Sequence, residues 1–273
     1  MKSKLTFLPG RSEASMKLPV LCFIPGGPGL SSKTLRSMDL LTRSFDVVYI
    51  DPPGTGGLPP VKAPSFDAVV ESMEREFAVI RRPLILCGHS FGAIYAIELA
   101  HRGKLNVAGL VALASPLSLR SCTKADEIFS EHMTPEILNE IEAYAANPTD
   151  INFSKSFASY AHLYFPTRTL AAGRELLLND KSSSESCLSI LPVLDKKSIG
   201  VDFVERAANI TTNKIMIAGA DEIIFTTDAL RLDAEEGGFK FHTIKDSGHF
   251  VTFDQPEAVA GLIESEFRQQ NRK

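Results

Sequence analysis

Short apolar runs alternate with amphipathic stretches along most of the chain, and this alternation limits what the chain can fold into. Most of the runs are nearly continuous in Val, Ile, Leu and Ala, as in parallel strands that are buried on both faces. The last run is more polar, with Lys, His, Thr and Asp among its residues. The predicted strands are 20–26, 45–51, 83–90, 107–116, 214–221 and 240–249.

The amphipathic stretches between the runs have the period and the length of helices. The predicted helices are 31–43, 66–81, 92–102, 226–236 and 255–269. Pro256 falls at the start of the last helix, where a missing N–H has no intrahelical partner. Strands and helices in alternation, joined by right-handed crossovers, predict an α/β fold with a doubly wound, mostly parallel sheet.

The alternation stops over residues 117–212, where no strand is evident. Helical patterns in this interval cover 126–133, 134–147 and 157–165. A polar, serine-rich segment (residues 179–186) follows, and we expect it to form an exposed loop. The interval therefore predicts a helical cap inserted into a core of residues 1–116 and 213–273. Such a cap would lie over the carboxyl ends of the strands, where open α/β sheets bind ligands.

Composition narrows the class of protein. Apolar residues make up 44% and charged residues 23%, as in soluble globular proteins. The net charge of −4 comes from scattered charges without a basic block, so we expect no nucleic-acid partner. No apolar run approaches the roughly 20 residues of a membrane span, so none is expected. The apolar stretch Leu18–Ile24 is short and lacks a cleavage pattern, which favours a strand over a signal peptide.

The four cysteines show no spacing typical of a metal site or of a disulfide framework. Cys22 and Cys87 lie within predicted buried strands, where cysteine behaves as a small hydrophobic residue. Buried free thiols are typical of a reducing compartment, so we expect a cytoplasmic location. We expect neither a metal nor a cofactor, and the sequence leaves the oligomeric state open.

A Gly-x-Ser-x-Gly pattern, Gly88–Gly92, ends one predicted strand and directly precedes a predicted helix. This context is the one in which the pattern forms a nucleophile elbow, with the serine hydroxyl exposed on a sharp turn. Flanking glycines let strand and helix approach closely, and the helix N-terminus favours negative charge. The alternative is a structural turn. We predict that Ser90 is a nucleophile.

A serine hydroxyl needs a base within hydrogen-bond reach. His249 follows the last predicted strand in Asp-Ser-Gly-His-Phe, so a loop would present it at the carboxyl edge of the sheet. The other histidines are less well placed: His89 inside the elbow, His101 in a helix, His242 in a strand, and His132 and His162 in the cap. We predict that His249 is the base.

The base in turn needs an acid that fixes its tautomer. Asp221 ends a predicted strand and precedes His249 in the chain order expected for this arrangement. The alternative role for Asp221 is to cap the following helix. Asp246 and Asp195 are the fallback candidates for the acid.

Acyl transfer also needs N–H donors for the developing oxyanion. The backbone N–H of Phe91, directly after the nucleophile, is one candidate. The Gly/Pro-rich loop Pro25–Gly29 offers the second, with Gly27 preferred over Gly26. The alternative for this loop is a tight turn without a catalytic role.

Together these motifs resemble those of the α/β-hydrolase superfamily, in its serine-nucleophile branch. The loop PGGPG followed by the turn Asp51–Gly56 is similar to the proline iminopeptidase-like hydrolases. The resemblance implies a small substrate cleaved beneath a helical cap. Pro25 stands where those peptidases have histidine, and Phe91 stands where they usually have tryptophan. We expect Asp51 to organise its turn.

We therefore predict a serine hydrolase that cleaves a small acyl ester or thioester. An iminopeptidase-like aminopeptidase is an alternative, and it would need a cap carboxylate for the substrate's ammonium group. The candidate carboxylates for this role are Glu127, Glu131, Glu136, Glu140 and Glu142, which also suit a solvated helix face. A second alternative function is that of a ligand receptor with weak or no turnover. The cap aromatics, expected mainly to form the cap's own core, are Phe129, Tyr144, Phe153, Phe157, Tyr160, Tyr164 and Phe165.

Overall fold

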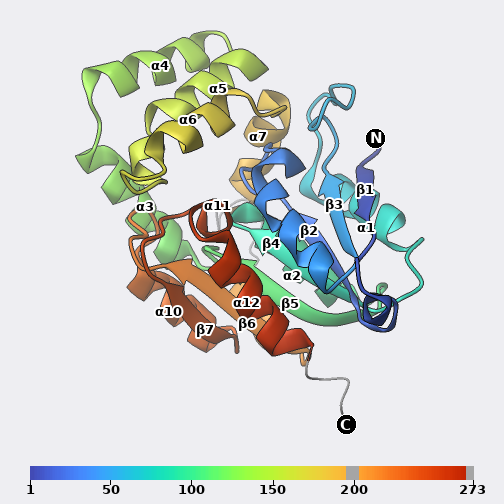
Figure 1. The fold of residues 1–273 in the computed structure, drawn as a ribbon. Coiled ribbons are helices and arrows are strands. Elements are labelled where there is room, and N and C mark those ends of the chain that lie inside the picture. Colours follow the sequence, from blue (N-terminus) through green and yellow to red (C-terminus); the bar gives the residue numbers. More distant parts are fainter. Residues whose placement is uncertain (195–202, 269–273) are drawn as a thin grey trace.

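A seven-stranded sheet forms the centre of the part of the chain that the structure describes (Figure 1). The computed structural model describes residues 1–194 and 203–268. The strand order is β1-β3-β2-β4-β5-β6-β7, and all neighbours are parallel except β1 and β3. The strands are β1 (Lys4–Leu8), β2 (Val20–Ile24), β3 (Val47–Asp51), β4 (Leu84–His89), β5 (Val107–Leu113), β6 (Asn213–Gly219) and β7 (Lys240–Ile244). The predicted doubly wound, mostly parallel sheet is confirmed.

The register of the parallel strands brings their carboxyl ends to one edge of the sheet. Ile24 at the end of β2 pairs with Gly88 in β4, and His89 pairs with Leu113 at the end of β5. Leu113 pairs in turn with Ile217 in β6. The loops that follow β2, β4 and β6 therefore leave the sheet side by side.

Helices cover both faces of the sheet, as the apolar composition of its strands requires. One face carries α1 (Phe66–Phe77), α2 (Phe91–His101), α9 (Phe203–Ala208) and α10 (Thr227–Glu236). The other face carries η2 (Ser32–Arg43), α11 (Val251–Asp254) and α12 (Pro256–Phe267). A short 3-10 helix, η1 (Glu13–Lys17), joins β1 to β2. Among these helices, η2, α1, α2, α10 and α12 agree with the five predicted ones to within a few residues, whereas η1, α9 and α11 were not predicted.

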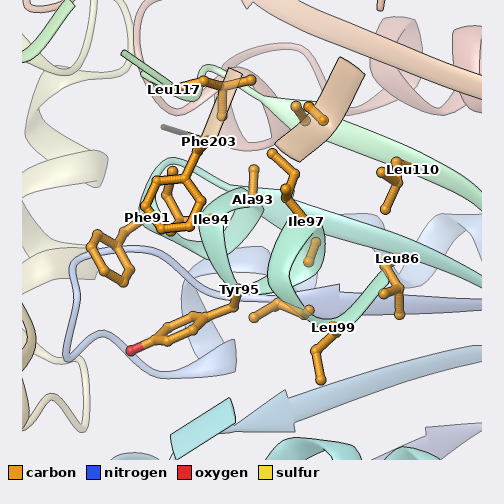
Figure 2. Packing of buried hydrophobic residues seen from close by; sticks show 14 of the residues in the cluster. Leu86, Phe91, Ala93, Ile94, Tyr95, Ile97, Leu99, Leu110, Leu117 and Phe203 are labelled. Atoms are coloured by element: carbon orange, nitrogen blue, oxygen red, sulfur yellow. The ribbon is translucent and has the colours of Figure 1, made fainter. Parts of the chain in front are cut away.

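The helix α2 is buried on almost all sides, and this holds the start of the helix in place. Nine of its residues, from Phe91 to Leu99, are buried. Figure 2 shows Ile94 and Phe91 close to Phe203 of α9. Phe66 at the start of α1 stacks on Tyr95 at a ring distance of 5.4 Å. A helix that is apolar all round belongs in the core of a protein.

The cap lies over the carboxyl edge of the sheet (Figure 1). It contains α3 (Leu119–Glu131), α4 (Pro135–Ala146), α5 (Asp150–Ser159), η3 (Ala161–Leu163), α6 (Leu170–Leu178), α7 (Ser184–Ile190) and η4 (Leu191–Leu194). Its first helix is fixed to α10 by Asp233, a fully buried carboxylate that accepts hydrogen bonds from the N–H groups of Leu117 and Ser118 (2.8 and 3.1 Å).

Two sequence expectations about the interval 117–212 need correction. Its last helix, α9, packs on α2 and contributes Phe203 and Ala207 to the core, so the cap helices end before it. The serine-rich segment is not an exposed loop, because Asp180 and all four of its serines are buried against the core and the cap. In the described part of the chain, no helix has both the length and the apolar character needed to span a membrane.

Candidate active site

Ser90 occupies a sharp turn between β4 and α2. Its backbone has φ 51° and ψ −124°, a conformation that is uncommon and costly for a residue with a side chain. The N–H of Ser90 donates to the carbonyl of Leu113 (2.8 Å), and Ser115 Oγ donates to the carbonyl of Ser90 (2.7 Å). A Cβ at Gly88 or at Gly92 would overlap with neighbouring backbone. The turn therefore needs both glycines of the pattern.

His249 lies in the loop between β7 and α11 and is buried. Its N–H donates to the carbonyl of Tyr164 in the cap (2.9 Å). Its ring centroid is 5.2 Å from that of Phe225 and 5.4 Å from that of Tyr164. It is also 5.0 Å from the ring of His89, the residue before Ser90. The structure thus brings His249 to the elbow from 160 positions away along the chain.

The carboxylate that contacts His249 belongs to Glu222, which corrects the prediction that Asp221 occupies this place. Glu222 Oε2 lies 2.8 Å from His249 Nδ1, and both side chains are buried. The carboxylate accepts, so this nitrogen carries the proton. Asp221 is exposed, and its backbone N–H donates to the carbonyl of Ser247 (2.9 Å). It does not cap α10 either, because Thr226 does so.

Sequence reasoning missed Glu222 by one position. The chain turns at residues 220 and 221 directly after β6, and this turn leaves Asp221 exposed while Glu222 is buried. The sequence signal was the adjacent pair Asp221 and Glu222 after the strand, since the carboxylate of either residue can accept a hydrogen bond from an imidazole N–H. Of the fallback candidates, Asp246 is exposed in a tight turn (φ 54°), and Asp195 lies outside the described residues.

His89 is buried beside His249 and supports the backbone of its loop. Its Nε2 lies 3.0 Å from the carbonyl of His249 and donates to it, while its Nδ1 is buried without a hydrogen-bond partner. Burial, with a smaller electrostatic contribution from the neighbouring His249, lowers the pKa of His89 from 6.5 to about 3. His89 is therefore neutral at physiological pH.

The loop after β2 packs directly on the elbow. A Cβ at Gly26 would lie 2.7 Å from the carbonyl oxygen of His89 and 3.0 Å from Ser90 Cβ. Gly27 has φ 110° and lines the same cavity as Ser90 and Phe91. Phe91 is the first residue of α2, so its N–H has no partner within the helix. The Pro25–Gly29 loop is also a tight turn, since the N–H of Leu30 donates to the carbonyl of Gly26 (3.2 Å).

A cavity of about 690 Å³ between the core and the cap contains Ser90 in its wall. Most of its lining is apolar and aromatic. Six of the seven aromatic residues expected in the cap core line it, namely Phe129, Tyr144, Phe153, Phe157, Tyr160 and Tyr164. They also pack on one another, as Phe157 does on Tyr164 with ring centroids 4.9 Å apart. The seventh, Phe165, stacks on Phe250 instead.

The cavity also contains two thiols that are poor nucleophiles. Burial raises the pKa of both Cys122 and Cys187 from 9.0 to about 12, so both are protonated at neutral pH. Within the described ranges, no group of three His, Cys, Asp or Glu residues could hold a metal ion.

Comparison with known proteins agrees with this architecture. The sequence model of the Alpha/beta hydrolase family matches residues 23–262. The chain belongs to the alpha/beta hydrolase family. This hydrolase is 23% identical over 252 residues to the biotin biosynthesis bifunctional protein BioHC of Cellvibrio japonicus, covering 91% of this chain and 47% of that one. The chain thus spans about half the length of this curated relative.

Solved structures share the fold of this alpha/beta hydrolase. MenH from S. aureus has a TM-score of 0.73 at 16% identity, with 97% of this chain and 98% of that one covered. An esterase from Exiguobacterium antarcticum has a TM-score of 0.71 at 15% identity, covering 96% and 94%. Proline iminopeptidase from Mycobacterium smegmatis has a TM-score of 0.66 at 15% identity, covering 98% and 94%. The resemblance inferred from the sequence is confirmed at the level of the fold.

Proposed function

We propose that this alpha/beta hydrolase is a serine hydrolase that cleaves a small ester or thioester through an acyl-serine intermediate. The observation that carries the proposal is the buried pair of His249 and Glu222, placed beside the turn that holds Ser90. A carboxylate on one imidazole nitrogen leaves the other nitrogen unprotonated, as a general base requires.

In the proposed reaction, Ser90 Oγ attacks the substrate carbonyl while His249 Nε2 takes its proton. Glu222 stabilises the imidazolium that forms. The N–H groups of Phe91 and Gly27 donate to the oxyanion of the tetrahedral intermediate. The imidazolium then gives its proton to the leaving alcohol or thiol, and an acyl-serine remains. His249 then takes a proton from a water molecule as the water attacks the acyl-serine, and the imidazolium returns this proton to Ser90 Oγ as the carboxylic acid leaves.

The lining of the cavity favours an ester or a thioester with an apolar acyl group. None of the five glutamates considered for an aminopeptidase lines it. The acidic residue in its wall is Asp126, which is exposed. An ammonium group placed among the cap aromatics would lose hydration without a buried carboxylate to replace it. The aminopeptidase is therefore the second candidate, supported by the fold of the solved iminopeptidase.

Two measurements test the proposal. A fluorescent organophosphonate should label the wild-type chain and leave Ser90→Ala unlabelled. p-Nitrophenyl esters of graded chain length, assayed beside aminoacyl-naphthylamides, should show turnover of the esters alone. Labelling that survives in Ser90→Ala would exclude Ser90 as the nucleophile. Preferred turnover of the naphthylamides would support the aminopeptidase, and the absence of labelling and turnover would support a ligand receptor.

A further inference from the structure

The serine-rich segment (residues 179–186) lies between the cap helices and two loops of the core. On the core side, the N–H of Ser183 donates to the carbonyl of Gly29 (2.8 Å). The N–H of Gly56, in the loop after β3, donates to the carbonyl of Lys181 (2.8 Å). Backbone of the segment thus pairs with backbone of both loops.

On the other side, the same segment is bonded to the cap. The N–H of Ser184 donates to Asp150 Oδ1 at the start of α5 (2.8 Å). The hydroxyls of Ser182 and Ser154 share a hydrogen bond of 2.9 Å. The segment therefore connects the cap to the loop that follows β2.

Asp180 connects the segment to the loop after β2 through both of its carboxylate oxygens. It is buried, with 7% of its surface exposed, and both carboxylate oxygens bind Ser31. The N–H of Ser31 donates to Oδ2 (2.9 Å), and its hydroxyl donates to Oδ1. Burial raises the pKa of the Asp180 carboxyl, while the two hydrogen bonds from Ser31 oppose this rise because they favour the ionised form. A single side chain of the cap thus fixes the far end of the Gly26–Ser31 loop.

The near end of that loop is fixed by the elbow. Gly26 has no room for a Cβ because the carbonyl of His89 and Ser90 Cβ lie against it. A Cβ at Gly29 would lie 2.5 Å from the carbonyl of Ser183. Gly27, the second oxyanion donor in the proposed mechanism, lies between these two attachments, so its orientation depends on both.

We propose that Asp180 is a positioning residue, which holds the Gly26–Ser31 loop so that the N–H of Gly27 points at the oxyanion formed on Ser90. The inference rests on the proposed function. It assigns to the cap a share in transition-state stabilisation, in addition to its contact with the substrate. Displacing this donor weakens a bond that forms only in the transition state, so kcat falls while KM changes little.

The first test is Asp180→Asn, assayed with p-nitrophenyl acetate, whose acyl group is too small to depend on the cap for binding. Asparagine keeps one acceptor oxygen and has an NH₂ donor in place of the other, so the acceptor for the Ser31 hydroxyl and the negative charge are both lost. We expect kcat to fall roughly 10-fold to 100-fold, the size of effect that a misplacement of about 1 Å produces. KM should stay within about threefold, because the contacts that bind the substrate in its ground state are unchanged.

Asp150→Asn is the matched control. Asp150 binds the same segment from the cap side through one oxygen, which the amide of asparagine can replace. Its kcat should stay within about twofold of wild type. Ser31→Ala is the milder second variant, because it removes the hydroxyl bond to Asp180 and keeps the N–H bond. Ser31→Ala should also lower kcat, by less than Asp180→Asn does. If Asp180→Asn does not fold, the kcat of Ser31→Ala tests whether Asp180 positions the loop.

Hydrogen exchange supplies a readout that does not depend on turnover. Peptides covering residues 24–36 should exchange faster in Asp180→Asn than in wild type, while peptides covering the His249 loop should not. Unchanged kcat in a folded Asp180→Asn, or a rise in KM without a fall in kcat, would overturn the inference. If wild type shows no Ser90-dependent turnover, the proposed function fails, and exchange in residues 24–36 alone decides whether Asp180 holds the loop.

Discussion

Glu222 and His249 form a buried hydrogen-bonded pair, with Oε2 and Nδ1 separated by 2.8 Å, although 27 positions separate the residues in sequence. The contact depends on β6 and β7 lying side by side, since Glu222 follows β6 and His249 follows β7. Their burial keeps water from competing for the bond. The pair is the part of the site on which most of the mechanism depends.

Glu222→Gln should lower kcat/KM by about 10²-fold to 10⁴-fold, because an amide cannot stabilise the imidazolium and its NH₂ group favours the wrong tautomer. Asp221→Asn should stay within about twofold of wild type, since Asp221 is exposed and does not contact the base. Steady-state kinetics on one p-nitrophenyl ester compares the two directly. An inactive Asp221→Asn beside an active Glu222→Gln would reverse the assignment.

Ser90→Ala and His249→Ala should each lower kcat/KM by at least about 10³-fold. The double variant should be no worse than either single one, because the two side chains act as a unit. Thermal unfolding should show that both variants stay folded. Losses that multiply in the double variant would mean that the two residues act independently.

The prediction for His89 concerns stability against acid. Because its pKa is about 3 in the folded chain, His89 stays neutral there while the unfolded chain takes up a proton below pH 6.5. Stability that is present above pH 6.5 is therefore lost as the pH falls toward 3, by about 3 kcal/mol at pH 4.

His89→Gln should remove this loss, because glutamine retains an N–H donor for the carbonyl of His249 and does not titrate. Urea unfolding at pH 7 and pH 4 measures the difference for each variant. His101→Gln is the control, since His101 is exposed at the end of α2 and should behave as wild type does. An acid sensitivity that persists unchanged in His89→Gln would contradict the prediction.

Substrate size should respond to Ser130, which lines the cavity and is exposed at its rim. Ser130→Trp places an indole over the cavity and should lower kcat/KM for long-chain esters about tenfold, with acetate esters nearly unaffected. Glu131→Trp, on the same helix but outside the cavity wall, should leave the chain-length profile unchanged. An equal loss for acetate and long-chain esters in Ser130→Trp would show that the cavity does not hold the acyl group.

The parallel core of the sheet could be predicted from sequence because burial on both faces leaves continuous apolar runs. β1 (Lys4–Leu8) was missed for the opposite reason. It is an edge strand with two exposed positions and pairs only with β3, so its composition resembles that of a loop. The helix α9 was placed in the cap because nothing in its sequence states which neighbour it packs on.

At the site, local patterns predicted the position of Ser90 and of the glycine loop, because both depend on short-range backbone geometry. The carboxylate beside His249 was predicted to be Asp221, and Glu222 is found there, since which of the two faces inward depends on how the chain turns after β6. The serine-rich segment (residues 179–186) was misjudged because polar residues are usually exposed. Here its amides and hydroxyls have partners in both the core and the cap, which permits burial.

The hydrogen bond from the N–H of His249 to the carbonyl of Tyr164 connects the proposed general base to the cap backbone. A Cβ at Gly248 would also lie 2.6 Å from that carbonyl, so the two chains are in close contact. Substitutions of side chains that project into the cavity can therefore change the substrate range without moving the backbone that holds His249. Insertions or deletions that shift the backbone near residue 164 would disturb the base itself, which makes this stretch a poor place to graft loops from other hydrolases.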